Sequence, residues 1–307
     1  MFLRPLRRFV AGVLPNFFYS WAYIPFIGDL FARIALTAPP ILVVSFPRSG
    51  SSWLGSRLGL ASNAAYLREP INTSFLSSGG QHTLKIIYPS RPNPLFTKCS
   101  AKAFLKAPRY DTNVVAYPKQ WLPWNVIGRR LLLKEVNPLA LGYWIKAYSP
   151  LIVFIIRHPA AIAASYTELG WQENSDVRNT PSEGCQSSYE IFGRRVGEVY
   201  QQAFEVLDKY PSHLVVKYED LVENEFAELS RIALFCGLNL PKSLFIPVPT
   251  DRKPAVSAKQ SPFSLNRRSS DQSIKWLRLL TSSQIDDIQK GYRHYSNLVY
   301  SANSDWP

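Results

Sequence analysis

The feature that most limits the fold of this 307-residue chain is a short apolar run that ends in a loop of small and hydroxyl residues. Residues 41–45, ILVVS, are aliphatic or β-branched and are preceded by prolines, which is typical of a strand buried on both faces. A helical pattern follows from Ser52 to Ala61. Similar apolar runs at 151–157 and 213–221 lead into helix-forming residues. The sequence therefore predicts parallel βαβ units in an α/β fold, with ligands at the carboxyl ends of the strands.

The loop between the first strand and the first helix has the composition of an anion-binding site. A helix N-terminus directs backbone N–H groups and a partial positive charge toward such a loop. Gly50 allows a ligand to approach the backbone closely, and the forked guanidinium of Arg48 adds a fixed charge. Hydroxyl donors come from Ser49, Ser51 and Ser52. The alternative is an ordinary strand-to-helix turn with incidental serines.

Hydrolysis of nucleoside triphosphates uses a related but different loop. Its motif is G-x-x-x-x-G-K-[ST], and here the first glycine and the lysine are absent. The nearest candidates for a magnesium-binding carboxylate after a strand are Glu219 and Asp220. We therefore expect a phosphate-like ligand and no metal, and a nucleotide kinase or hydrolase is the alternative enzyme class.

Two motifs in order resemble sulfotransferases that use 3′-phosphoadenosine 5′-phosphosulfate (PAPS). SFPRSGSSWL resembles the loop that binds the 5′-phosphosulfate, and VFIIRHPAAIAASY resembles the 3′-phosphate motif, with Arg157 and Ser165. The resemblance implies a P-loop-containing, three-layer α/β/α fold with a central, mostly parallel sheet. It also implies PAPS as co-substrate, with PAP as its product. The donor-binding residues of the loop would be Pro47, Arg48, Ser49, Gly50, Ser51, Ser52 and Trp53.

Weaker similarities extend the resemblance over residues 40–300. VVKYEDLV is similar to the family's late strand and turn, and RRSSDQSIKWLRLL is similar to its C-terminal basic loop followed by a helix start. In the family this basic loop contacts the 3′-phosphate, so Arg267 and Arg268 are candidates for the same role. Their register differs by a residue or two from that of the aryl and steroid branch.

Sulfuryl transfer also needs a base for the acceptor hydroxyl. Small-molecule sulfotransferases carry a histidine in a Lys-Thr-His segment, whereas the comparable segment here is LLLKEVNP. Glu135 is one candidate base, beside Lys134, whose charge lowers a neighbouring pKa or assists at the leaving oxygen. The alternative is that both residues merely flank the end of a strand. Arg48 and the loop amides suit the stabilisation of charge on the transferred group.

Glu69 is the rival base. YLREPI resembles the Glu-Pro step that faces the acceptor in carbohydrate sulfotransferases, and a carboxylate there suits a base or a sugar ligand. An ion pair between Arg68 and Glu69 at a helix end is the alternative, and His82 is a third, weaker candidate base. The resemblance favours the carbohydrate branch over the aryl branch on the basis of three segments, RSGSSWL, REP and LLKEV. The expected acceptor is therefore a hydroxyl group of a glycan or glycolipid.

The composition agrees with an anionic ligand. The chain has 35 Lys and Arg against 22 Asp and Glu, a formal charge of +13, although a basic surface also aids solubility. No nucleic-acid recognition motif appears, so no nucleic-acid partner is expected. The three cysteines are widely spaced and have no partners at metal-ligand spacing, which argues against a zinc site and suits a reducing compartment. A non-catalytic, membrane-associated nucleotide-binding protein remains an alternative from another class.

Residues 1–38 read as an appended N-terminal arm, followed by a sulfotransferase domain at 39–307. The uncharged stretch from Phe9 to Gly28 is about long enough to span a bilayer, but Pro15, Asn16 and Pro25 interrupt it. The arm therefore either lies in a membrane interface or packs on the domain. We expect a cytoplasmic protein, peripheral to a membrane in the first case. Residues 70–130 are rich in proline, serine and glycine and are expected to form a loop-rich acceptor region.

Overall fold

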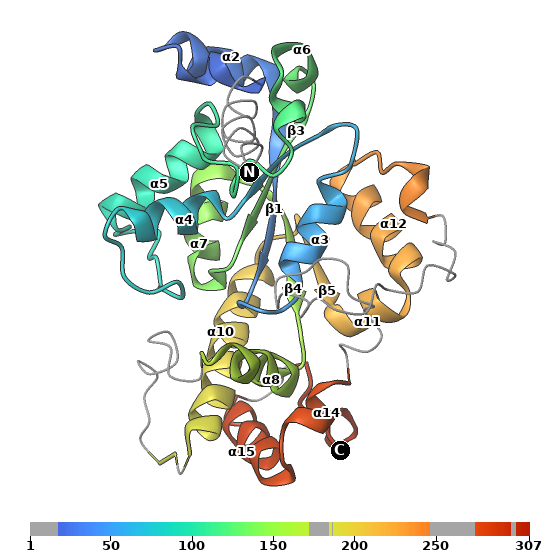
Figure 1. Cartoon of the computed structure of the whole chain (residues 1–307). Helices are drawn as coiled ribbons and strands as arrows, with labels where there is room; N and C mark the ends of the chain where they lie inside the picture. Colours follow the sequence, from blue (N-terminus) through green and yellow to red (C-terminus); the bar gives the residue numbers. More distant parts are fainter. Residues whose placement is uncertain (1–17, 172–183, 186, 246–273, 296–298) are drawn as a thin grey trace, which may run out of the picture.

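The computed structural model describes residues 18–171, 184–185, 187–245, 274–295 and 299–307 (Figure 1). In this part of the chain, five strands form one sheet in the order β2-β3-β1-β4-β5, and every neighbouring pair is parallel. The predicted α/β fold with a mostly parallel sheet is thus confirmed. The strands are Thr37–Ser45 (β1), Ala64–Arg68 (β2), Arg130–Glu135 (β3), Leu151–Ile156 (β4) and His213–Lys217 (β5).

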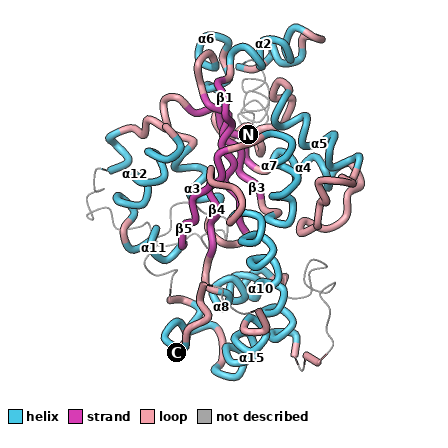
Figure 2. Tube along the Cα trace, turned by 180° about the vertical axis from the view of Figure 1, so that it is seen from behind, coloured by secondary structure: helices cyan, strands magenta, loops and turns pink. Residues whose placement is uncertain are grey.

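Helices cover both faces of the sheet. Figures 1 and 2 show α4, α5 and α7 on one side of the strands and α3, α11 and α12 on the other, which gives the three layers. The helices are Ile27–Ala35 (α2), Ser51–Leu58 (α3), Pro70–Ser77 (α4), Pro94–Leu105 (α5), Pro123–Val126 (α6), Leu141–Tyr148 (α7), Pro159–Leu169 (α8), Ser188–Leu207 (α10), Tyr218–Glu223 (α11), Glu225–Cys236 (α12), Trp276–Leu279 (α14) and Ser282–Tyr292 (α15). Short 3₁₀ turns lie at Ser20–Tyr23 (η1), Pro118–Trp121 (η2), Pro138–Ala140 (η3), Lys242–Phe245 (η4) and Asn303–Asp305 (η5).

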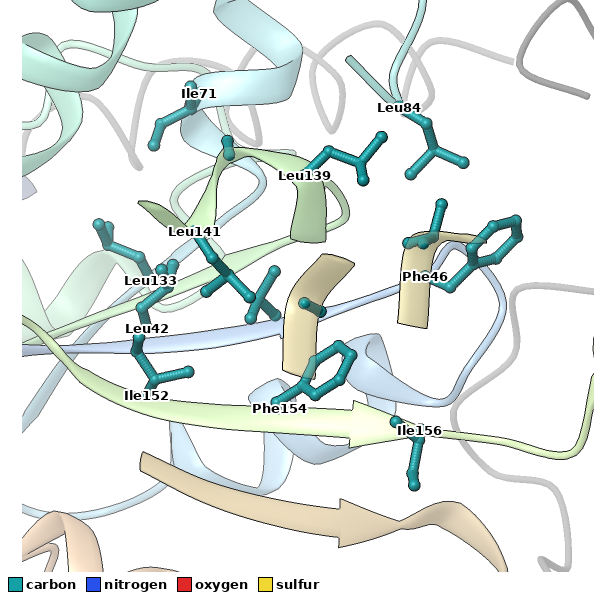
Figure 3. Packing of buried hydrophobic residues seen from close by; sticks show 14 of the residues in the cluster. Leu42, Phe46, Ile71, Leu84, Leu133, Leu139, Leu141, Ile152, Phe154 and Ile156 are labelled. Atoms are coloured by element: carbon teal, nitrogen blue, oxygen red, sulfur yellow. The ribbon is translucent and has the colours of Figure 1, made fainter. Parts of the chain in front are cut away.

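The central strand shows why its sequence is continuously apolar. Successive side chains of a strand point to opposite faces, so Leu42 and Val44 enter one hydrophobic core while Ile41 and Val43 enter the other. All four side chains are fully buried. Figure 3 shows Leu42 beside Leu133 and Ile152 of the neighbouring strands in the larger core. A strand covered on both faces positions its carboxyl end, and hence the following loop, rigidly.

The strand order also determines where a ligand binds. The chain leaves β1, places β2 and β3 on one side of it, and then returns to place β4 and β5 on the other side. In open parallel sheets, ligands bind at the carboxyl ends of the strands where the direction of winding changes. The loops after β1, β3 and β4 meet at this point.

Most predicted elements appear at the expected positions. The apolar run at 41–45 forms the second half of β1, the run at 151–157 contains β4, and the run at 213–221 contains β5 and the start of α11. Thr281 and Gln284 form a capping box at the start of α15: the Thr281 hydroxyl accepts from Gln284 N, and the Gln284 side chain accepts from Thr281 N.

The prediction that residues 70–130 form a loop-rich region is wrong at Pro70–Ser77 and Pro94–Leu105, where the chain forms helices α4 and α5. Both helices begin with proline at the first position, which has no N–H to lose. The Asn93 side chain caps α5 by accepting from Phe96 N at 3.0 Å. These signals of a helix start are visible in the sequence, but the apolar periodicity of residues 70–130 is weak, and the helices were therefore not predicted.

The described part of the N-terminal arm packs on the domain. Tyr19 is fully buried, and its hydroxyl donates to Tyr110 O at 3.1 Å. Residues 1–17 lie outside the described part, and β1 begins at Thr37, inside the segment assigned to the arm. Among the described helices, none is both long enough and apolar enough to cross a membrane.

Candidate functional site

The loop after β1 turns the chain sharply into α3. Arg48 and Gly50 adopt left-handed backbone conformations, with φ of 70° and 90°, and Gly50 is the N-cap of α3. The Ser45 hydroxyl donates to the Ser51 hydroxyl at 2.7 Å and ties the strand end to the first turn of the helix. The first N–H groups of a helix have no partner within the helix. The loop therefore surrounds a point at which amides, hydroxyls and the helix dipole favour an anion.

Gly50 is required at its position for two reasons. Its φ of 90° is unfavourable for residues with a Cβ. A Cβ added there would lie 2.3 Å from the ring of Tyr218, the first residue of α11. The loop backbone thus lies directly against the aromatic ring of the first residue of α11, which follows β5.

The two motifs predicted to bind phosphate groups lie together. The Arg48 Nε donates to the Ser165 hydroxyl at 3.0 Å, and the Arg157 guanidinium donates to Arg48 O at 2.9 Å. Arg157 directly follows β4, and Ser165 lies on α8, a little more than two turns into the following segment. Side chains separated by more than 100 residues therefore form one cluster of hydrogen-bond donors next to the N-terminus of α3.

Arg157 is held from several sides. Tyr200 of α10 accepts from Arg157 N at 2.9 Å and donates to Arg157 O at 3.0 Å. The guanidinium carbon lies 4.4 Å from the ring centroid of Tyr218, a cation–π contact. Arg157 is buried, so this arrangement fixes a positive charge in a largely dry environment. A cation placed in this way is suited to an anionic ligand.

The residue after Arg157, His158, anchors the turn. His158 Nδ1 accepts from Ala160 N at 3.3 Å and caps α8, while Nε2 lies 3.1 Å from Asp305 O, which places the proton on Nε2. The imidazole stacks on Trp276, and burial lowers the pKa of His158 to about 4. The C-terminal residues of the chain therefore pack on the back of the Arg157 loop.

Lys134 and Glu69 form an ion pair at the ends of β3 and β2. The Lys134 ammonium donates to the Glu69 carboxylate, and Glu69 N donates to Lys134 O at 2.7 Å. Only 2% of the Lys134 side chain is exposed, against 28% of that of Glu69. Lys134 pairs with Val43 in the sheet, so the ion pair lies beside the carboxyl end of β1. An acid–base pair therefore lies near the predicted anion-binding loop.

The ion pair determines the charge state of Glu69. Burial by itself raises the pKa of this carboxyl group, but the Lys134 charge and hydrogen bonds from Lys134 and Asn72 bring the pKa below its ordinary value. Glu69 is therefore ionised at neutral pH. The alternative partner, Arg68, instead donates to Asn113 O at 2.9 Å.

Glu135 has a different environment. Its carboxylate accepts from the backbone N–H groups of Ile71 at 2.6 Å and Asn72 at 3.3 Å, so it caps the N-terminus of α4 from below. It is almost completely buried. Burial and the charge of Glu69 raise the pKa of Glu135 to about 8. The neighbouring carboxyl groups of Glu69 and Glu135 thus have pKa values shifted in opposite directions.

The remaining predicted residues fall into two groups. Pro47 and Ser49 are buried in the loop, Ser52 and Trp53 are half-buried in the first turn of α3, and Arg57 lies over the Trp53 ring at 5.3 Å. Arg267 and Arg268 lie outside the described residues. Within the described ranges, no group of three or more His, Cys, Asp or Glu side chains is arranged to hold a metal ion.

Sequence analysis missed three residues of this cluster. Tyr218 contacts both Gly50 and Arg157, Tyr200 holds the Arg157 backbone, and Asn72 donates to Glu69 at 3.4 Å. Tyr218 follows an apolar strand in the same way as Arg157, so its place at the carboxyl edge of the sheet was predictable. Tyr200 lies in the middle of the long helix α10, and nothing in its local sequence distinguishes it from a core residue.

Comparisons with known proteins show similarity to sulfotransferases. A sequence model of the sulfotransferase family matches residues 95–242, a segment that contains Lys134, Arg157 and Ser165 but neither the loop after β1 nor Glu69. No curated protein matches the chain in a sequence search.

Solved sulfotransferase structures are similar to the chain. The sulfotransferase domain from the curacin biosynthetic pathway has a TM-score of 0.53 at 17% identity, covering 86% of this chain and 99% of that domain. The corresponding domain of the Synechococcus PCC 7002 olefin synthase has a TM-score of 0.47 at 18% identity, with 86% and 97% covered. A mouse sulfotransferase solved with PAP has a TM-score of 0.41 at 14% identity, with 91% and 92% covered. The family match over residues 95–242 and the fold shared with the curacin-pathway domain make this chain similar to sulfotransferases in sequence and in architecture.

Proposed function

We propose that the protein transfers the sulfuryl group of PAPS to a hydroxyl group of an acceptor. The observation that carries this proposal is the contact between the two predicted phosphate-binding motifs, in which Arg48 donates to Ser165 and Arg157 donates to Arg48 O. A ligand with two phosphate-like groups needs two such sites at the same sheet edge. PAPS supplies an activated sulfuryl group and carries a second anionic group, the 3′-phosphate, some distance away.

The donor groups present fit such a ligand. The loop after β1 offers the N-terminus of α3, the hydroxyls near Ser51 and the Arg48 guanidinium, all of which favour negative charge. Arg157 and Ser165 offer a second set on β4 and α8. In our proposal, the α3 N-terminus binds the 5′-phosphosulfate and Arg157 with Ser165 binds the 3′-phosphate. Arg48 lies between the two sets and stabilises charge on the transferred group.

We assign Glu69 as the base that accepts the hydroxyl proton. It is ionised, partly exposed and lies beside the loop, whereas Glu135 is buried and occupied by two backbone N–H groups of α4. Lys134 holds the Glu69 carboxylate in place and keeps a positive charge next to the reacting groups. The low pKa makes Glu69 a weak base before acceptor binding, so approach of the hydroxyl to this ion pair is part of the catalytic step.

The acceptor class in this proposal is a glycan, including the sugar of a glycolipid. This assignment rests on the Arg68-Glu69-Pro70 step, which resembles that of carbohydrate sulfotransferases, and on the partly exposed Glu69. A kinase or hydrolase is less well supported, because both Glu219 oxygens are already bonded, to His158 N at 3.0 Å and to the Tyr300 hydroxyl at 2.6 Å. The location of the protein in a reducing, cytoplasmic compartment remains a prediction, and it rests on the cysteine usage.

Calorimetry with PAP tests the donor assignment. Purified protein is titrated with PAP in the presence of EDTA, and in parallel with ATP and magnesium. We expect metal-independent binding of PAP, a much weaker response to ATP, and loss of PAP binding by at least tenfold in Arg157→Ala, which removes a buried charge-assisted contact. Lys242→Ala, in the 3₁₀ turn η4 outside the donor cluster, is the control. Preference for ATP with magnesium would replace this proposal with a nucleotide kinase or hydrolase.

A further inference from the structure

The amino-terminal edge of the sheet carries an exposed apolar surface. We call it the α2–α6 surface, because α2, the turn before it and α6 supply its side chains. Phe26 is 88% exposed, Ile34 74% and Trp124 71%. Isolated exposed apolar residues are common, but a group of this size on adjacent elements indicates a binding surface. Its residues are Tyr23, Ile24, Phe26, Ile27, Leu30, Ile34, Trp124 and Ile127.

Helix α2 is apolar on two opposite faces. Its small residues Gly28, Ala32 and Ala35 are buried against the protein. Ile27, Leu30 and Ile34 follow at spacings of three and four, so they share one face, and all three point to solvent. Asp29 and Arg33 are the charged residues of this helix, and an apolar helix face is normally covered by other apolar groups. The outer face of α2 is thus suited to contact an apolar phase.

Hydrogen bonds join α2 and α6 into one surface. Gly128 N, just after α6, donates to Ala35 O at 2.7 Å, and Thr37 N donates to Arg129 O at 2.8 Å. The Trp21 indole donates to Trp121 O at 2.5 Å. Figures 1 and 2 show both helices together at the same end of the molecule. Segments about 100 residues apart therefore present their apolar side chains in a fixed arrangement.

The charges around this surface are positive. In the described segments 18–36 and 117–130 there is one acidic residue, Asp29, and it already pairs with Arg109 at 3.1 Å and accepts from Ala107 N at 3.0 Å. The cations Arg33 and Lys119 of these segments are exposed. An apolar surface with aromatic residues and surrounding cations matches the interface of an anionic bilayer, where rings lie at headgroup depth and cations meet phosphate groups.

We propose that the α2–α6 surface binds peripherally to a bilayer that contains anionic lipids. The apolar side chains enter the boundary between headgroups and acyl chains, and the cations contact the lipid phosphates. A surface of a second copy or of another protein would not require the excess of cations over acids. The contact involves α6 as well as the N-terminal segment, so it is a property of the folded domain.

This orientation has a consequence for the acceptor. Helix α2 ends at Ala35, and β1 then runs from Thr37 to Ser45 before the anion-binding loop begins. Eight strand steps at about 3.3 Å each place the loop roughly 25 Å from the α2–α6 surface. The bound protein therefore holds its site away from the bilayer, which favours a soluble acceptor or a long glycan over a short glycolipid headgroup.

Vesicle flotation of the full chain tests the proposal. Vesicles of phosphatidylcholine alone are compared with vesicles that also contain phosphatidylserine. We expect flotation with the second kind and at least a tenfold loss of vesicle affinity in the double variant Phe26→Asn with Ile34→Ser. Position 26 has a φ of 61° and a ψ of −46°, and asparagine is chosen there because it adopts a positive φ more readily than most residues. Arg33→Gln with Lys119→Gln should reduce binding to anionic vesicles by about fivefold for each charge removed.

A matched control separates this surface from general hydrophobicity. Leu234 on α12 is 85% exposed and lies outside the α2–α6 surface, so Leu234→Ser should leave flotation unchanged. The proposal is overturned if the wild type does not float, or if the double variant floats equally well. It is also overturned if gel filtration shows a dimer that the double variant dissociates while vesicle binding is absent. PAP binding should be the same in all these variants, which keeps this test independent of the proposed reaction.

Discussion

The ion pair between Lys134 and Glu69 should respond asymmetrically to mutation. Glu69→Gln removes the anionic partner of an ammonium group whose side chain is only 2% exposed. Lys134→Met removes the partner of a carboxylate whose side chain is 28% exposed and which also accepts from Asn72. Burying an unpaired charge costs more than exposing one to water. The two single variants therefore differ in their free energy of unfolding, although they break the same contact.

The exposed fractions of the Lys134 and Glu69 side chains determine how much unfolding free energy each variant loses. Removing one partner of a fully buried pair costs about 3–5 kcal/mol. Because water reaches part of Glu69 and glutamine retains an acceptor oxygen, we expect Glu69→Gln to lower the free energy of unfolding by roughly 2 kcal/mol. Lys134→Met should cost about 1 kcal/mol or less. The double variant, with no charge left, should lie within about 1 kcal/mol of the wild type.

Urea denaturation of the four proteins measures these values as a double-mutant cycle. Sulfuryl transfer from PAPS, followed once an acceptor is available, should fall by about 10²–10⁴-fold in both single variants and stay low in the double variant. Recovery of stability without recovery of activity would separate the structural role of the pair from its catalytic one. Equal losses of stability in the two single variants, or a double variant less stable than either, would refute the reasoning.

Three further predictions concern the turn after β4 and the loop after β1. The pKa of His158 is about 4 in the folded protein against an ordinary 6.5, so the unfolded state binds the extra proton below pH 6.5. Stability should fall by about 2 kcal/mol from pH 7 to pH 5 through this group, and urea titrations of His158→Asn should lack this component. Gly50→Ala should lower PAP affinity at least tenfold in calorimetry. The control Gly79→Ala, at a φ of 88° with no atom within 4 Å of the added Cβ, should cost only about 1 kcal/mol of stability. Equal PAP affinities of the Gly50→Ala and Gly79→Ala variants would contradict the role of Gly50. Ser165→Ala should weaken PAP binding by about tenfold or more, because it removes a hydrogen bond to a charged phosphate, and an unchanged affinity would exclude Ser165 from the site.

Sequence alone predicted the parts of the fold that local patterns encode. The run Ile41–Ser45 is apolar on both faces, which identifies a strand inside a parallel sheet, and the loop after it has the small residues that a helix N-terminus with a bound anion requires. Arg157 and Ser165 were predicted from one continuous segment that resembles the 3′-phosphate motif. Their contact with Arg48 was not visible, since it depends on β1 and β4 being neighbours in the sheet.

The roles of the carboxylates depended on long-range contacts. Glu69 and Glu135 both follow strands in the sequence, and nothing local separates them. The structure distinguishes them by their partners, because Glu69 meets Lys134 while Glu135 meets the backbone of α4. The packing of Tyr19 in the core was equally hidden, since its partner Tyr110 is 91 residues away.

A crystal structure with PAP bound is the measurement that tests the central claim most directly. We expect the 5′-phosphate at the N-terminus of α3, within hydrogen-bond distance of the backbone between Ser49 and Ser52, and the 3′-phosphate on Arg157 and Ser165. Glu69 and Lys134 should then lie beside the 5′-phosphate, on the side open to an acceptor. A 3′-phosphate bound away from Arg157 and Ser165, or PAP bound elsewhere on the sheet, would contradict the account.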